Sequence, residues 1–199
     1  MTEQWQRLEK QLALIIEVDQ LKNVLRRTKV KSAQGRLENS AEHSWQVTLL
    51  AVLLEEHANQ PVELAKVLKM LLIHDIVEID AGDTFVYDTV ASAAQEENEI
   101  AAAERLFGML PEDQAVVLYA LWQEFEAAQT AEARYAKALD RMVPMLLNHH
   151  NDGQSWVEHG VARDQVIRVN GRIADGSAIL WEKMTQVIEH AVEQGWLKP

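Results

Sequence analysis

Apolar residues recur at three- and four-residue steps along most of the chain, which is the spacing of one helix face. The first three series of this kind predict three helices before Val77. Their positions are Trp5, Leu8, Leu12, Ile15 and Ile16, then Trp45, Leu49, Val52 and Leu53, and then Leu64, Val67, Leu68, Leu71 and Leu72. Alternating apolar and polar runs of useful length are absent, so the pattern favours helices over strands.

Capping residues, prolines and glycines place the ends of the predicted helices. Pro61 and Pro111 suit a first helical residue, and Gly195 suits the end of a helix. Asn39 or Ser40 can cap the helix that follows them. Further helices are predicted over 91–109, 111–127, 131–148 and 177–194, with a shorter one over 161–169. The sequence therefore predicts an all-α bundle of about six to eight helices.

Length and composition point to one domain. The chain has 199 residues, of which 48% are hydrophobic, and no linker-like stretch or repeat divides it. We therefore expect a single domain over residues 1–199. The sequence holds no cysteine, so a disulfide, a thiolate nucleophile and a zinc–thiolate site are excluded. Any metal would be bound by histidine nitrogens and carboxylate oxygens.

Charge and hydropathy limit the partners. The 19 Lys and Arg residues stand against 31 Asp and Glu residues, which gives a net charge of -12. So acidic a chain repels long polyanions, and we expect no nucleic acid polymer as a partner. The N-terminal segment is charged where a signal peptide is apolar, and the longest nearly apolar run, 47–54, is too short to cross a membrane. The expectation is a cytoplasmic protein with no membrane partner.

A basic segment interrupts the helical pattern between residues 22 and 36. It contains no acidic residue, and its cations are Lys22, Arg26, Arg27, Lys29, Lys31 and Arg36. A solvated surface loop is the simpler interpretation of such a run. A local binding site for an anion is the alternative, because the rest of the chain would repel one.

The strongest candidate chemistry lies at His74 and Asp75, which end the apolar run 70–73. Glu78 follows His74 by four positions, so the two side chains share one face of a helix. Burying a carboxylate and an imidazole at an apolar helix end is costly unless they are paired or bind a cation. A helix end with a core histidine and an exposed aspartate is the alternative.

Two further residues extend this cluster. His43 lies near the start of the second predicted helix, and Asp140 lies inside the otherwise apolar stretch 136–147, where a carboxylate needs a partner. With His74 and Asp75 they would supply two nitrogens and two oxygens, a set suited to a divalent transition metal. Pro144 cannot donate to the carbonyl of residue 140, so we expect a bend beside Asp140.

Three segments together resemble the H…HD…D signature of the HD-domain metal phosphohydrolases. They are 38–44 (ENSAEHS), 74–83 (HDIVEIDAGD) and the pair Leu139-Asp140. This order of motifs is far more specific than an isolated His-Asp pair. The resemblance covers residues 21–150 and is greatest for the subgroup of YfbR-like 5′-deoxynucleotidases and HD domain-containing protein 2.

The resemblance implies a helical HD domain with a metal-binding core over 21–150 and a C-terminal helical extension over 151–199. It also implies a homodimer and hydrolysis of nucleoside 5′-monophosphates, in particular deoxyribonucleoside 5′-monophosphates, to nucleoside and phosphate. One divalent transition metal (Mn, Co, Fe, Ni or Zn) is implied, with His43, His74, Asp75 and Asp140 as its ligands.

The same resemblance suggests roles for the remaining polar residues. Glu78 would orient or deprotonate the attacking water. Arg26 matches the arginine that orients the phosphate in this family, and Asp83 would lie by the substrate, where it could protonate the departing sugar oxygen. The basic segment would then supply positive charge to a phosphate dianion.

The chain departs from the family pattern near the sugar. Bacterial members often carry tryptophan directly after the arginine, and here that position is Arg27. The loop after Asp83 reads Thr84-Phe85-Val86 in place of a proline-containing turn. We expect Arg27 and this loop to contact the substrate and to decide the preference for its sugar.

Two other functions stay open. The same metal ligands could serve an HD hydrolase that acts on an alarmone, a nucleoside triphosphate or a cyclic nucleotide. A non-catalytic helical binding module, in which the four ligands are only polar residues, is the other alternative. A substrate panel separates the first from a nucleotidase, and metal analysis of the purified protein tests the second.

Overall fold

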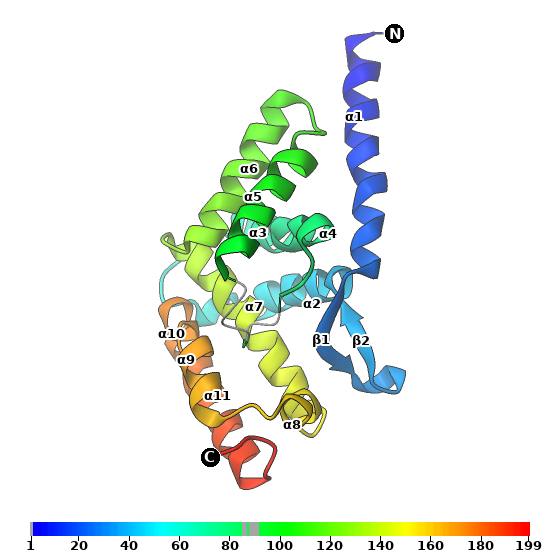
Figure 1. The fold of residues 1–199 in the computed structure, drawn as a ribbon. Coiled ribbons are helices and arrows are strands. Elements are labelled where there is room, and N and C mark those ends of the chain that lie inside the picture. The colour runs from blue at the N-terminus through cyan, green and yellow to red at the C-terminus, as the bar shows by residue number, and fades with distance from the viewer. Residues whose placement is uncertain (1, 85–86, 88–91) are drawn as a thin grey trace.

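The computed structural model describes residues 2–84, 87 and 92–199 (Figure 1). The α-helices are α1 Glu3–Glu17, α2 Ser40–Leu53, α3 Leu64–Ile73, α4 Glu78–Ala81, α5 Ser92–Phe107, α6 Glu112–Ala127, α7 Ala131–His150, α8 Gln154–His159, α9 Arg163–Asn170, α10 Ile173–Gly176 and α11 Ala178–Glu193. Short 3₁₀ helices cover Val18–Asn23, Lys31–Ala33, Glu55–His57 and His74–Val77. The prediction of an all-α fold is confirmed, and the short helices bring the number above the predicted six to eight.

Capping explains where several helices begin. Asn39 accepts a hydrogen bond from the backbone N–H of Glu42 (3.0 Å), and the backbone N–H of Asn39 donates to the Glu42 carboxylate in return. This capping box fixes the first turn of α2. Pro111 lies one position before α6 as its N-cap, not inside the helix as predicted. None of the helices in the described ranges is long and apolar enough to cross a membrane.

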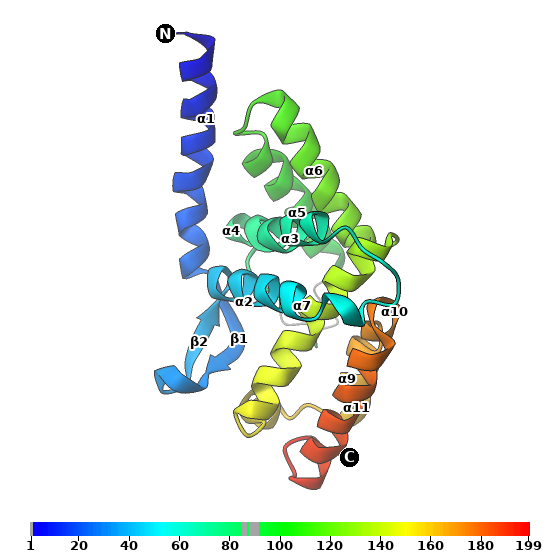
Figure 2. The same cartoon turned by 180° about the vertical axis from the view of Figure 1, so that it is seen from behind.

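Helix α7 forms the centre of the fold. It contacts α2, α3, α6, α10 and α11, and Tyr135, Ala136 and Leu139 on it are fully buried. Helix α10 packs closely on it, because a Cβ atom on Gly176 would lie only 2.2 Å from the carbonyl oxygen of Arg134. Figure 2 shows α2 and α3 crossing α7 side by side. Pro144 lies inside α7, and the helix continues past it to His150.

A small hairpin corrects the expectation that the chain lacks strands. Strands β1 Leu25–Val30 and β2 Arg36–Asn39 pair in antiparallel orientation, with Lys29 opposite Leu37. Gln34 and Gly35 have positive φ angles of 57° and 78°, which allow the tight turn between the strands. The strands are short and largely polar, and β1 contacts α7 and α8. Their stability therefore depends on tertiary contacts more than on an alternating sequence pattern.

Helix α1 is predicted correctly, but its apolar face is not buried. The helix stands beside the N-terminal end of α6, to which Arg7 donates hydrogen bonds at Asp113 (2.6 and 2.7 Å) (Figure 1). The exposed fraction is 58% for Trp5, 68% for Ile15 and 73% for Ile16. A stripe of this kind on a soluble helix is typical of an interaction surface.

Candidate metal centre

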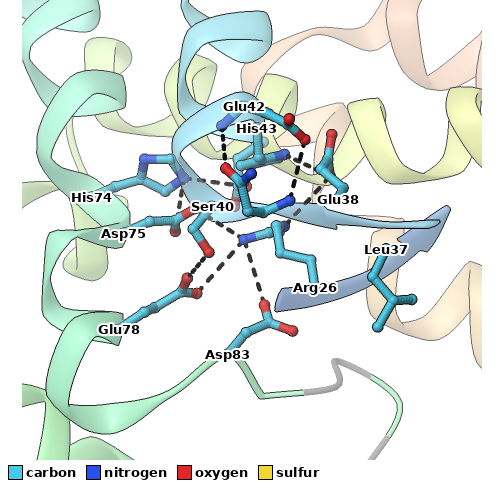
Figure 3. Close-up of polar contacts among 12 residues, drawn as sticks. Arg26, Leu37, Glu38, Ser40, Glu42, His43, His74, Asp75, Glu78 and Asp83 are labelled. Carbon is cyan, nitrogen blue, oxygen red and sulfur yellow. Dashed lines mark hydrogen bonds and ion pairs between the residues drawn. The ribbon is translucent and has the colours of Figure 1, made fainter. Parts of the chain in front are cut away.

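Three packed helices bring the four predicted ligands together. His43 lies in the first turn of α2, which the Asn39 cap fixes. His74 and Asp75 begin the 3₁₀ turn that follows α3, and Asp140 lies within α7. Figure 3 shows the side chains of His43, His74 and Asp75 pointing toward one another. Because α2, α3 and α7 contact each other, residues far apart in the sequence meet here.

The ligand atoms are close enough to share one ion. One atom each from His43, His74 and Asp75 lie within 4.8 Å of one another, and all three residues are buried. His74 Nε2 lies 3.0 Å from Asp75 Oδ1 and 3.5 Å from Asp140 Oδ1. Asp140 Oδ1 also lies 2.9 Å from His43 Nε2. Asp140 therefore contacts both imidazoles, although it lies outside the mutually close set of three.

These separations fit a divalent metal. Two atoms that each lie about 2.1 Å from one ion are about 3.0 to 3.4 Å apart at right or tetrahedral angles. His74 Nδ1 donates to the carbonyl oxygen of Leu71 (2.9 Å), so Nε2 is the ring nitrogen that faces the carboxylates of Asp75 and Asp140. The two nitrogens and two carboxylates form a donor set suited to a transition metal.

Electrostatics also favour a cation at this point. Burial lowers the pKa of His74, but the negative charges of Asp75 and Asp140 outweigh it and raise this pKa to about 10. Burial raises the pKa of Asp75, yet the charges on His74 and Arg26 lower it to about 2. Burial also raises the pKa of Asp140, but hydrogen bonds with His43 and His74 outweigh this effect and hold the pKa well below its usual range. The carboxylates therefore stay ionised at neutral pH.

Arg26 lies directly beside the ligand cluster, at the start of β1 (Figure 3). Its Nη1 lies 2.9 Å from Asp75 Oδ2, 3.4 Å from Asp83 Oδ1 and 3.6 Å from Glu78 Oε1. Its Nε lies 3.7 Å from Glu38 Oε2. Burial lowers the pKa of Arg26, but the surrounding carboxylates more than reverse that effect and raise it. The guanidinium is thus a buried permanent cation within an acidic shell.

Glu78 and Asp83 hold their protons more tightly than ordinary carboxyls. Burial and the charge of Asp75 raise the pKa of Glu78 to about 9, against the opposing effect of Arg26. Ser40 Oγ donates a hydrogen bond to Glu78 Oε2 (2.5 Å). Burial also raises the pKa of Asp83, and Arg26 again opposes the rise. Two carboxyls with raised pKa values beside the buried guanidinium of Arg26 are suited to proton transfer.

Four cations of the basic segment lie away from the ligand cluster. Their charges are paired with surface carboxylates, in the pairs Lys22–Asp19, Lys29–Glu158, Lys31–Asp152 and Arg36–Glu42. Arg26 enters the site, and Arg27 lines a cavity beside it. That the segment supplies positive charge to a phosphate stays a prediction.

Two connected cavities adjoin the cluster. A cavity of about 270 Å³ is lined by His74, Asp75 and Glu78. A second cavity, of about 110 Å³, is lined by Arg27 and Trp156. Both also have Arg26, Asp83, Thr84 and Asp140 in their walls. Arg27 and Thr84 thus lie in cavity walls beside the cluster, and their contact with a substrate stays a prediction, whereas Phe85 and Val86 lie outside the described residues.

The sequence pattern did not reveal several residues at the site. Glu38 is only 2% exposed and lies between Arg26 and His43. Ser40 was expected only as a helix cap, yet its hydroxyl contacts Glu78. Trp156 is buried and also lines the second cavity. The position of Glu38 directly before a helix cap was the one sequence feature that could have drawn attention to it. Acidic residues are common at such positions, so the feature does not predict a functional role.

The fold and the buried cluster define a helical protein with a site for a divalent metal. The model of the HD domain family matches residues 18–181 of the chain. The chain therefore belongs to the HD domain family. A crystal structure of a predicted metal-dependent phosphohydrolase from Magnetospirillum magnetotacticum is 46% identical, with a TM-score of 0.94 over 100% of this chain and 99% of that chain.

Curated relatives carry a more specific name. The 5′-deoxynucleotidase HDDC2 of Xenopus laevis is 31% identical over 62% of this chain and 60% of that protein. The human 5′-deoxynucleotidase HDDC2 is 29% identical over 62% of this chain and 59% of its own length. The chain thus spans about 60% of the length of the curated relatives it matches. PH0347 from Pyrococcus horikoshii, 19% identical with a TM-score of 0.61 over 89% of this chain and 98% of that chain, shares the fold.

Removal of one ligand tests the metal centre directly. Asp140→Ala or His74→Ala should abolish metal retention, because each leaves the remaining ligands without a full set of donors. Elemental analysis of the purified variants measures the loss, and phosphatase activity should disappear with the metal. Asp164→Ala, a change at an 88% exposed carboxylate on α9, should retain the wild-type metal content. Full wild-type activity after exhaustive chelation, with metal content verified as nil, would contradict the assignment.

Proposed function

We propose that the chain is a metal-dependent phosphomonoesterase that releases phosphate from nucleoside 5′-monophosphates, deoxyribonucleoside 5′-monophosphates in particular. The observation that carries the proposal is the buried guanidinium of Arg26, which lies 2.9 Å from Asp75 within the His–Asp cluster. A permanent cation beside a metal site is suited to a phosphate dianion. The similarity to proteins named 5′-deoxynucleotidases supports the choice of substrate class.

We assign His43, His74, Asp75 and Asp140 as the ligands of one divalent transition metal (Mn, Co, Fe, Ni or Zn). A bound metal of this kind would polarise the phosphate and lower the pKa of a water molecule at the site. The protein contributes the fixed geometry, since its four ligands come from packed helices. No covalent intermediate is required, and no serine or threonine in a recognisable nucleophile motif serves the site.

Arg26, Glu78 and Asp83 bind the phosphate and transfer the protons in this proposal. Arg26 holds the phosphate in line and offsets the negative charge of the phosphate, which the acidic chain would otherwise repel. Glu78, whose pKa burial and the charge of Asp75 raise, orients the attacking water and accepts its proton once a bound cation lowers that pKa. Asp83, whose pKa burial raises, retains a proton and gives it to the sugar oxygen as the bond from phosphorus to that oxygen breaks.

The second cavity is suited to the nucleoside. Its wall contains Arg26, Asp83 and Asp140 of the cluster, the cations Arg27 and Arg141, the apolar side chains of Pro144 and Met145, and several uncharged polar and aromatic groups. Among these are Thr28 of β1, Ser155 and Trp156 of α8, and Asn170 of α9. Because residues beyond 150 contribute to this wall, we propose that residues 1–199 form one domain in which the C-terminal extension completes the core over 21–150.

Replacing Arg26 tests the phosphate site. Arg26→Ala should lower kcat/KM by on the order of 100-fold, about 3 kcal/mol, the effect of losing one fixed charge-stabilising donor. Metal content should not fall, because a nearby positive charge is removed. Arg36→Ala in β2, whose side chain is half exposed and pairs with Glu42, serves as the control and should keep wild-type activity. A kcat/KM for Arg26→Ala within about threefold of wild type would exclude the role.

Phosphate release from a panel of ribo- and deoxyribonucleoside monophosphates, with Mn²⁺, Co²⁺, Mg²⁺ or chelator, tests the proposed reaction. An arginine is flexible and donates hydrogen bonds, so Arg27 can admit a 2′-hydroxyl that a flat tryptophan would reject. The ratio of kcat/KM between the two sugars should stay below about 100, and Arg27→Trp should shift it toward the deoxy substrate. An unchanged ratio would show that Arg27 does not contact the sugar, and no release from any substrate would refute the function.

We also propose that the protein acts as a homodimer in the cytoplasm. The chain has no cysteine and so needs no oxidising compartment. The apolar stripe of α1 and the exposed residues Trp45 (67%) and Leu53 (64%) of α2 are the surfaces that a second copy would cover. A two-fold axis lets one stripe pack on its own copy, so a single amphipathic helix can supply both halves of the interface.

The molar mass in solution tests the dimer. Light scattering should give about twice the chain mass of 22.6 kDa. A double change of Ile15→Glu and Ile16→Glu should yield monomers, because burying two carboxylates in an apolar interface is costly. Ile179→Glu on α11, where the side chain is 55% exposed, should leave the dimer intact. A monomeric wild-type protein at micromolar concentration would contradict the proposal.

A further inference from the structure

Three buried polar atoms converge at one edge of the site without hydrogen-bond partners among the described residues. They are Arg26 Nε, Glu38 Oε2 and His43 Nδ1. Glu38 Oε2 lies 3.7 Å from Arg26 Nε and 3.8 Å from His43 Nδ1. Figure 3 shows the Glu38 side chain at the end of β2, next to both Arg26 and His43.

The placement of Glu38 is costly for the fold alone. The residue is 2% exposed, and a buried carboxylate without close partners loses its hydration for little return. An apolar residue at this position would avoid that cost. Sites that keep such a group usually use it, because strained or underpaired buried polar groups concentrate where function requires them.

We propose that Glu38 is a positioning residue that links the metal-binding half of the site to the phosphate-binding half. It accepts the Nδ1 proton of His43 on one side and the Nε proton of Arg26 on the other. This role rests on the function proposed above. Contacts of 3.7 and 3.8 Å are longer than direct hydrogen bonds, but such contacts commonly tighten when a site takes up its ligands.

The contact with His43 decides which ring nitrogen can bind a metal. His43 Nε2 faces Asp140 at 2.9 Å and must present a lone pair to act as a ligand. The proton then resides on Nδ1, where Glu38 is the acceptor that faces it in the described structure. A carboxylate in this position orients the imidazole and makes its other nitrogen a better donor to the metal.

The contact with Arg26 holds the guanidinium from its second side. Nη1 faces Asp75 and Asp83, while Nε faces Glu38. With both edges held, the planar group keeps one orientation toward the phosphate site. One carboxylate can therefore fix the orientation of the histidine ligand and of the arginine relative to each other.

Metal affinity measures this role without relying on catalysis. Metal-free Glu38→Gln should bind Co²⁺ about 10- to 100-fold more weakly than wild type in titration calorimetry, the usual effect of losing a carboxylate behind a histidine ligand. Inorganic phosphate should also bind the Co²⁺-loaded variant more weakly. Glu42→Gln is the matched control, since this carboxylate directly precedes His43 but faces Arg36 at the surface. Glutamine preserves the capping box there, so Co²⁺ affinity should stay at the wild-type value.

A conservative variant separates positioning from simple structural support. Glu38→Asp keeps the carboxylate and should recover part of the Co²⁺ affinity lost in Glu38→Gln, with circular dichroism unchanged in both. A Co²⁺ dissociation constant for folded Glu38→Gln within about threefold of wild type would overturn the proposal, as would equal losses in Glu38→Gln and Glu42→Gln. If wild type binds Co²⁺ but hydrolyses no nucleotide, the proposed function fails while this comparison still decides the role of Glu38.

Discussion

The excess of buried negative charge at one point governs the site. Arg26 is surrounded by four carboxylates, of which Glu38 comes from β2 and Asp75, Glu78 and Asp83 from the segment 75–83, and Asp140 lies nearby. One guanidinium cannot neutralise so many acids in a region with little water. Burial and the charge of Asp75 raise the pKa of Glu78, and the charges of Asp75 and Asp140 raise the pKa of His74 against the effect of burial. Both groups therefore hold protons that reduce the negative charge. A divalent cation would meet the same need.

Such a cluster persists only because the apolar packing around it is strong. Helix α7 carries Asp140 between the buried residues Leu139 and Met142, and it contacts the helices that bear the other ligands. The capping box at Asn39 fixes the turn that contains His43. Burial of many apolar side chains offsets the free-energy cost of burying a few charged ones. The core can therefore hold a site whose own contribution to folding is unfavourable.

The sequence predicted the parts of the site that depend on local signals. Asn39 or Ser40, as a possible cap, marks the start of the helix that carries His43, and the apolar run before His74 marks the helix that presents Asp75. The hairpin was missed because it is stabilised by contacts of β1 with α7 and α8 and of β2 with α2, which no local pattern encodes. For the same reason the sequence could not show that Arg26 turns inward while Lys29 pairs with Glu158 at the surface.

The walls of the two cavities overlap but differ. Of the proposed metal ligands, His74 and Asp75 line only the larger cavity and Asp140 lines both, whereas Arg27, Trp156 and Asn170 line only the smaller one and come from β1, α8 and α9. Residues of α8 and α9 lie after the last metal ligand in the sequence and belong to no ligand motif. They can therefore change without disturbing His43, His74, Asp75 or Asp140. In the proposed function, substrate choice would depend in part on this wall, which is one physical way in which the same metal ligands can serve different phosphoesters.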